Sequence, residues 1–219
     1  MINYLIEPTF LQIVYLSFWV AFYSITIAFV IGFPLGVMIG MNHFRGKKIL
    51  LLLVSSLLAF PSVVVGLVVF MMLADVGPLG WLHWLFTPIA MVIAQGLLVL
   101  PFIIFTCQQQ IEQIYGKYHL LFISLKKSKW LSALTIIYEN RINVLTLFAN
   151  GFARALSAIG AVIIVGGNID GQTRVLTTNI SLQIGQGNFE LALMMGGVLL
   201  AMALILNTAV FLLQDAIRN

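Results

Sequence analysis

The chain has 219 residues, of which 61% are hydrophobic and 8% are charged, with a net charge of +4. Soluble domains carry about a quarter charged residues, so this composition excludes a water-soluble fold and predicts a membrane protein. The apolar runs are continuous rather than alternating, which favours spanning helices over a β-barrel. We therefore expect an all-α, polytopic membrane bundle of about five helices that forms a single domain over residues 1–219.

The composition also limits the chemistry of the chain. Its single cysteine, Cys107, excludes an intrachain disulfide, and its three scattered histidines lack the spacing of metal ligands. No Ser, His and Asp set and no pair of histidines with an acid is clustered, so we expect no enzyme activity. We also expect no cofactor, no bound metal and no nucleic acid partner, because the basic residues gather in two loops, as the positive-inside rule explains.

Five apolar segments predict the membrane spans, at residues 10–33, 49–73, 87–107, 142–165 and 191–213. The interval 42–48 holds three Lys or Arg residues and the interval 108–141 holds five, whereas 75–86 holds none. Cytoplasmic loops carry an excess of Lys and Arg. This distribution therefore predicts an N-terminus outside and a C-terminus inside.

Three residues inside these spans are unusual for a bilayer. Pro61 removes a helix hydrogen bond in the second span and predicts a kink. Gln95 lies well inside the third span and needs partners, either as a bundle contact or as a pathway residue. Arg154 lies about 18 Å into the fourth span, where a charge faces a partner or water rather than lipid. It either bonds carbonyls or Gln95 and holds the bundle, or faces the pathway and lowers the barrier to an anion.

The segment from Gly160 to Thr178 reads G-A-V-I-I-V-G-G-N-I-D-G-Q-T-R-V-L-T-T. It resembles the G-A-V-x-I-V-G-G-N-I-x-G-x-T-R-V-x-T-T signature of the permease subunits of ABC-type tungstate importers. Two further patches, residues 60–67 and 85–101, are similar to the same family, although Ser62 replaces the family's second proline. The resemblance implies the fold of a type I ABC importer permease in the bacterial inner membrane.

The resemblance also implies which residues line the translocation pathway or its gate. They are Pro61, Ser62, Gly66, Gln95, Arg154, Ser157, Gly166, Gly167 and Asn168. The interval 166–190 is expected to be an outer loop. Its polar residues either close local turns or form a gate that meets an outer binding protein.

The interval 108–141 is predicted to be cytoplasmic and to contain short helices at the membrane face. Such helices are typical of segments that neutralise anionic lipid. The family resemblance instead implies a coupling loop that enters a cleft of a separate ATPase subunit, and of the usual coupling motif the chain keeps only Ile136. The residues implied in this contact are Ser124, Lys126, Lys127, Ser128, Lys129 and Trp130. The turn at Gly46 and Lys47 lacks the spacing of a phosphate-binding loop, so ATP is expected to bind to the partner.

The resemblance thus implies the membrane-spanning subunit of an ATP-driven oxyanion importer, with tungstate as the first substrate and molybdate or another oxyanion as the alternative. The implied partners are a second copy of the chain, cytoplasmic ATPase subunits, a periplasmic or lipid-anchored binding protein, and membrane lipid. A secondary carrier would need carboxylates inside the membrane, and none lies in the predicted spans. A small channel would explain Arg154 but not the long basic inner loop.

Overall fold

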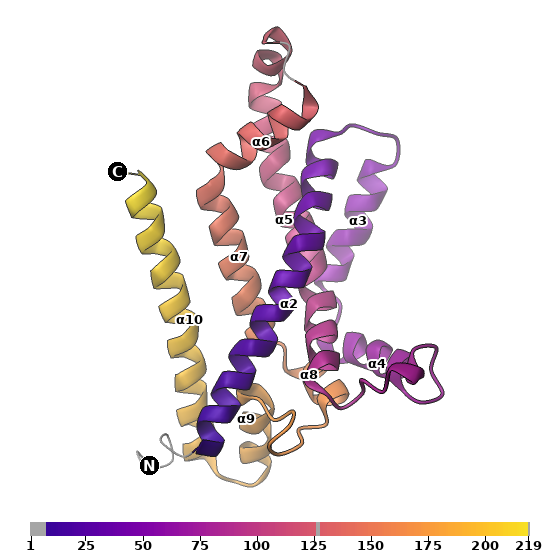
Figure 1. The fold of residues 1–219 in the computed structure, drawn as a ribbon, viewed down its shortest axis with the longest axis vertical. Helices are drawn as coiled ribbons and strands as arrows, with labels where there is room; N and C mark the ends of the chain where they lie inside the picture. The colour runs from indigo at the N-terminus through magenta and orange to yellow at the C-terminus, as the bar shows by residue number, and fades with distance from the viewer. Residues whose placement is uncertain (1–7, 126–127, 219) are drawn as a thin grey trace.

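The computed structural model describes residues 8–125 and 128–218, and these two stretches contain helices and no strand. Figure 1 shows the path of the chain through the bundle. Helix α2 (Pro8–Met41) crosses it in one direction and α3 (Lys47–Leu58) returns, α5 (Pro88–Ser124) crosses again and α7 (Arg141–Leu156) returns, and α10 (Phe189–Arg218) makes the last crossing. The described chain therefore begins and ends at opposite ends of the bundle.

Up to five of these crossings are long and apolar enough to span a membrane. Helices α2, α5 and α10 qualify by themselves. Two pairs of shorter helices qualify together, by length and composition. In the first pair, α3 meets α4 (Ser62–Leu73) at an angle of 97°, and in the second, α7 meets α8 (Ile159–Gly166) at 55°. The fold is thus a multi-pass helix bundle with two broken spans.

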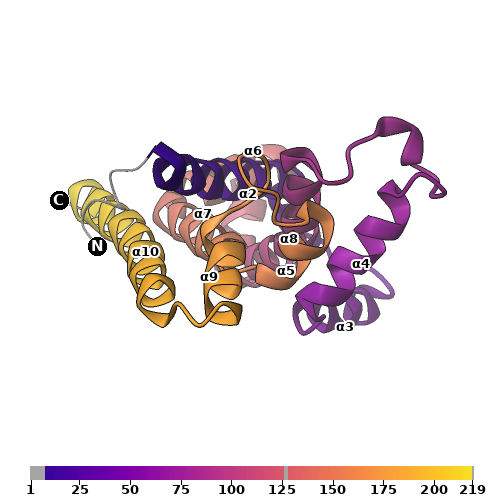
Figure 2. The ribbon, with the colours of Figure 1, turned by 90° about the horizontal axis from the view of Figure 1, so that it is seen from below.

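The centre of the bundle is formed by α2 and α5, with α7 packed against both. Figure 2 shows α10 at one edge of this group and the α3–α4 pair at the other. Small residues bring α2 and α5 close together: a Cβ atom on Gly36 would lie 2.6 Å from Cβ of Cys107. Lipid is as apolar as leucine, so close packing of this kind, rather than apolar burial, holds membrane helices together.

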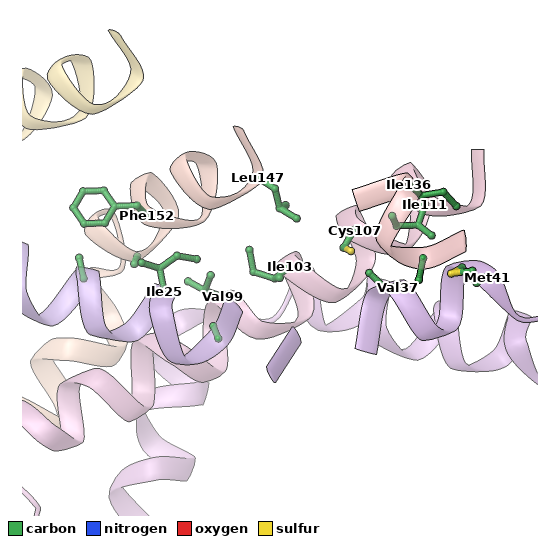
Figure 3. Packing of buried hydrophobic residues seen from close by; sticks show 14 of the residues in the cluster. Ile25, Val37, Met41, Val99, Ile103, Cys107, Ile111, Ile136, Leu147 and Phe152 are labelled. Atoms are coloured by element: carbon green, nitrogen blue, oxygen red, sulfur yellow. The ribbon is translucent and has the colours of Figure 1, made fainter. Parts of the chain in front are cut away.

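Large apolar side chains fill the space between these three helices and the short α6 (Lys129–Glu139). Figure 3 shows their packing, with Phe152 and Ile25 at one end and Ile136 and Met41 at the other. The members that are almost fully buried are Ile25, Val99, Ile103, Cys107, Ile111, Ile136, Leu147 and Phe152. Because the cluster joins α2, α5, α6 and α7, it fixes the positions of the helices from which the candidate site is built.

The two breaks have different local causes. The kink predicted at Pro61 is present: Pro61 takes an extended conformation (φ −61°, ψ 132°) and precedes the first residue of α4. The second break was not expected, because no proline or glycine interrupts Ser157 and Ala158. There the Ser157 hydroxyl donates to the carbonyl of Arg154 at 2.9 Å, a local bond that competes with the helix ladder. The fourth predicted span, residues 142–165, is therefore broken at this point into α7 and α8.

Two other expectations about helix bounds are also corrected. Helix α5 does not end near Cys107 but continues to Ser124, so it carries Gln108 and Glu112 beyond the predicted span. These side chains are tolerated because they are paired: Gln108 donates to Glu112, and Lys47 Nζ lies 2.9 Å from Glu112 Oε1. Glu112 therefore lies on the same helix as the third predicted span, beyond the predicted end of that span at residue 107.

The interval predicted to be an outer loop contains a helix, α9 (Leu176–Gly185), whose first four residues are buried. Its N-terminus is capped from two sides. The Thr178 hydroxyl accepts from the N–H of Val175 at 3.1 Å, and the Ser17 hydroxyl of α2 accepts from the N–H of Leu176 at 2.8 Å. These bonds satisfy donors that a helix start leaves unpaired, so α9 is anchored to α2.

Candidate functional site

The two helix breaks lie beside each other because α4 and α8 pack together along their lengths. Small residues make this contact unusually close. A Cβ atom on Gly66 would lie 2.7 Å from Cα of Ala161, and one on Gly160 would lie 2.9 Å from the backbone nitrogen of Val63. The two half-helices therefore form one unit, which we call the α4–α8 pair, held between two breaks. Three predicted site residues, Ser62, Gly66 and Gly166, lie in this pair.

Arg154 connects the two broken spans. Its Nη2 donates to the carbonyl of Leu58, the last residue of α3, at 3.0 Å, and its guanidinium lies 5.5 Å from the ring centroid of Phe102 on α5. The last carbonyls of α3 lack N–H donors from a following helical turn because the chain bends there, and they carry the negative end of the helix dipole. Arg154 also belongs to the last turn of α7, so it neutralises two helix ends at once.

No acidic side chain pairs with Arg154 among the described residues. The position one helical turn later is Ala158, which offers no carboxylate. The contact with Leu58 is one of the two arrangements expected from the sequence, in which Arg154 bonds a carbonyl and holds the bundle. Its half-buried guanidinium also keeps donors that a single carbonyl does not use.

Gln95 lies away from Arg154, in the core between α2 and α5. Its Oε1 is 3.1 Å from the Ser24 hydroxyl, and it is 4% exposed. Gln95 lines a small internal cavity of about 10 Å³ together with Ser17 and Thr177. That volume is about the size that one water molecule needs. The sequence alternative in which Gln95 pairs with Arg154 is not what the structure contains.

The predicted outer site residues lie at the far end of α8. Gly167 ends the helix in a left-handed conformation (φ 68°), and Asn168 follows with φ 52°. The Thr173 hydroxyl donates to the carbonyl of Gly166 and accepts from the N–H of Ile169, which closes the turn. Ser157, at the other end of α8, is exposed. The nine predicted pathway residues are thus divided among the breaks, the core and this turn.

Some residues that build this region were missed or undervalued in the sequence. The Ser17 hydroxyl donates to the carbonyl of Ile13 in its own helix and also caps α9. Arg174 pairs with Asp170 at 3.0 Å, and its Nε is buried without a partner among the described residues. Thr178 stands three residues after the N-cap residue Val175, but valine is not a capping residue, so the sequence pattern does not mark the start of α9. The contact with Ser17 spans 159 residues and has no local signal.

The described coupling residues lie at the end of α5 and at the start of α6. Ser128 caps this helix by accepting from the N–H of Leu131 at 3.3 Å, and Lys129 Nζ donates to Oδ1 of Asn42, the residue after α2, at 3.1 Å. Trp130 is 74% exposed. Ser124 ends α5, where its hydroxyl donates to the carbonyl of Leu121 at 2.8 Å. Lys126 and Lys127 lie outside the described residues.

These features define a class of protein, a multi-pass membrane bundle in which two broken helices cross at their breaks. Residues 32–219 match the family model described as the binding-protein-dependent transport system inner membrane component. The chain belongs to this family, and it is a multi-pass permease of the inner membrane.

Individual proteins that are similar to this chain are permeases for anions. The chain is 36% identical to the tungstate uptake system permease protein TupB of Peptoclostridium acidaminophilum over 95% of this chain and 92% of that protein. It is 38% identical to the protein of the same description from Campylobacter jejuni, over 75% of this chain and 69% of that protein. It is 33% identical to a probable anion ABC transporter permease protein of Haloferax volcanii, over 87% and 84% respectively.

Proposed function

We propose that this chain is the membrane-spanning subunit of an ATP-driven importer of tungstate. The observation that carries the proposal is its similarity to a tungstate uptake permease over 95% of its length, which includes both helix breaks and α9. Tungstate is a tetrahedral dianion, and molybdate has the same charge and a similar size, so molybdate is the second candidate.

The α4–α8 pair is the proposed gate. Its two helices are packed too closely to slide independently, and each is joined to the rest of its span by a break. A unit of this kind can rotate about its two breaks while the centre of the bundle, α2 and α5, stays fixed. Arg154 holds the ends of both inner half-spans, α3 and α7, and so positions the pivot. The proposed gate residues are therefore Pro61, Ser62, Gly66 and Ser157, and Arg154 is the structural contact between the two inner half-spans.

The proposed partners are a second copy of this chain, a pair of cytoplasmic ATPase subunits and an outer binding protein. We place the ATPase contact at α6, which presents the exposed Trp130 beside an apolar groove of about 360 Å³ between α2 and α6. Lys129 lies at the edge of this groove and is held by Asn42. A short helix fixed to two spans in this way would transmit a push from the ATPase to the bundle.

We propose that α6 faces the cytoplasm and that α9 and the turn at residues 74–87 face outward. The support is the distribution of Lys and Arg, which gather at the α6 end. A cysteine at Val76, which is fully exposed, and one at Lys117 should react with an impermeant thiol reagent from opposite sides of the membrane, in a variant that lacks Cys107. Labelling of both positions from the same side would contradict this orientation.

Uptake by the reconstituted complex of permease, ATPase and binding protein tests the substrate. Tungsten accumulated in proteoliposomes is measured by mass spectrometry, with a hundredfold excess of a second anion outside. We expect molybdate to reduce tungsten accumulation and sulfate to leave most of it, because the chain resembles tungstate permeases. If sulfate reduces tungsten accumulation as much as molybdate does, the pathway is not specific for tungstate and carries oxyanions in general.

A further inference from the structure

An open pocket of about 550 Å³ lies where the turn between α2 and α3 meets α5. Basic and apolar side chains share its lining, which includes His43, Phe44, Lys47, Lys48, Ile49 and Glu112. The pocket lies at the start of α3, whereas the α4–α8 pair follows the other end of that helix (Figure 1), and the transport proposal assigns the pocket no role. Its size fits a phosphate ester together with part of a glycerol group.

The two lysines of this pocket differ in their charge balance. Lys47 is 8% exposed and is neutralised by Glu112, which in turn accepts from Gln108. Lys48 is exposed and has no counter-charge among the described residues. Both lysines occupy the first turn of α3, which contains no acidic residue, and cations at that end oppose the helix dipole. The pocket therefore keeps an excess positive charge that an anion would neutralise.

The position of Lys48 relative to α3 points to lipid as the source of that anion. Residues four apart lie on the same helix face, so Lys48 stands directly above Leu52. Ile49, Leu52 and Leu53 are 65%, 65% and 60% exposed and form an apolar stripe that runs away from the pocket. In a spanning helix such a stripe meets acyl chains, and a lysine at its end extends toward the headgroups.

We propose that this pocket binds the phosphate of an anionic phospholipid, with Lys48 as the principal cation and the apolar stripe of α3 as the contact for the acyl chains. His43 and Phe44 also line the pocket, and Ile49 belongs both to its lining and to the stripe. A basic residue near an anionic membrane surface contributes about 1 kcal/mol, which corresponds to a change in affinity of about fivefold. The site is independent of the transported substrate.

Lipid binding to the assembled permease–ATPase complex tests the proposal. Native mass spectrometry measures the affinity for phosphatidylglycerol and for phosphatidylcholine in the wild type and in Lys48→Gln, Lys48→Arg and Lys117→Gln. Lys117 is the matched control, because it is an exposed lysine near the same end of α5 and lies outside the pocket. Glycerol 3-phosphate is added in a parallel arm to distinguish a soluble phosphate ester from a lipid.

We expect the wild type to prefer phosphatidylglycerol, Lys48→Gln to bind it about fivefold more weakly, and Lys48→Arg and Lys117→Gln to bind it normally. Phosphatidylcholine binding should be the same in all four proteins. The proposal is overturned by equal phosphatidylglycerol affinity in Lys48→Gln and wild type, or by an equal loss in Lys117→Gln. Displacement of the lipid by millimolar glycerol 3-phosphate would make this a soluble anion site, and absence of bound lipid from the complex would show that protein covers it.

Discussion

Replacement of Gly66 by alanine is expected to force α4 and α8 apart and to lower the free energy of unfolding by about 1–3 kcal/mol. The new Cβ atom would lie 2.7 Å from Cα and 3.0 Å from the carbonyl oxygen of Ala161. Both neighbours are backbone atoms, so no side chain can turn away to make room. The rate of uptake per folded protein should also fall, because the substitution separates the two helices of the proposed gate.

Gly116→Ala is the matched control for this change. Gly116 is also inside a helix, and an added Cβ atom there meets nothing within 4 Å. Alanine in a helix interior is favoured over glycine by roughly 0.5–1 kcal/mol, so this variant should be as stable as the wild type or more stable. Thermal unfolding of both purified proteins in one detergent measures the difference. If Gly66→Ala unfolds at the same temperature as Gly116→Ala, the close packing of α4 on α8 is not present in the protein.

Removal of Arg154 is expected to have the second large effect. Arg154→Gln should lower the amount of assembled complex in the membrane, since the Leu58 carbonyl loses a charge-assisted hydrogen bond. Hydrogen bonds to charged groups contribute about 1.5–3 kcal/mol, and the cation contact with Phe102 is lost as well. Arg154→Lys keeps the charge but not the planar guanidinium, so the amount of assembled complex should lie between that of the wild type and that of Arg154→Gln.

Transport per assembled complex separates the two roles of Arg154. We expect the complexes that do assemble with Arg154→Gln to transport at a rate close to that of the wild type, because the structure engages the side chain with a carbonyl. The measurement is tungsten uptake divided by the amount of complex on a quantitative blot. A pathway role predicts the opposite pattern: normal assembly, little uptake with Arg154→Gln and partial uptake with Arg154→Lys. Normal assembly together with normal uptake would contradict both roles.

Local sequence signals predicted the helical class and the first break, because they act over a few residues. Continuous apolar runs require helices in a bilayer, and Pro61 cannot donate to the ladder of its own helix. The signature from Gly160 to Thr178 similarly indicated the family that the full-length comparison shows. None of these signals depends on how the helices pack.

The remaining features depend on contacts between distant segments. The α7–α8 break lies at Ser157 and Ala158, which are compatible with a continuous helix, and its neighbour Arg154 finds its acceptor 96 residues away in Leu58. Helix α9 reads as a loop because it is short and polar, and its cap comes from Ser17 in another helix. Helix α5 extends past Cys107 because Lys47 neutralises Glu112, a pairing across 65 residues. Bonds between distant segments therefore determine where these helices begin and end, and no pattern in the neighbouring sequence indicates them.

The central claim is that this chain forms the pathway of an ATP-driven tungstate importer, and tungsten accumulation in proteoliposomes tests it most directly. The vesicles contain the permease with its ATPase, binding protein is supplied outside, and ATP or a non-hydrolysable analogue is enclosed. The account predicts accumulation above the outside concentration with ATP, and none with the analogue, without the binding protein or without the ATPase subunit. Equal accumulation without ATP hydrolysis would indicate a carrier or a channel and would contradict the account.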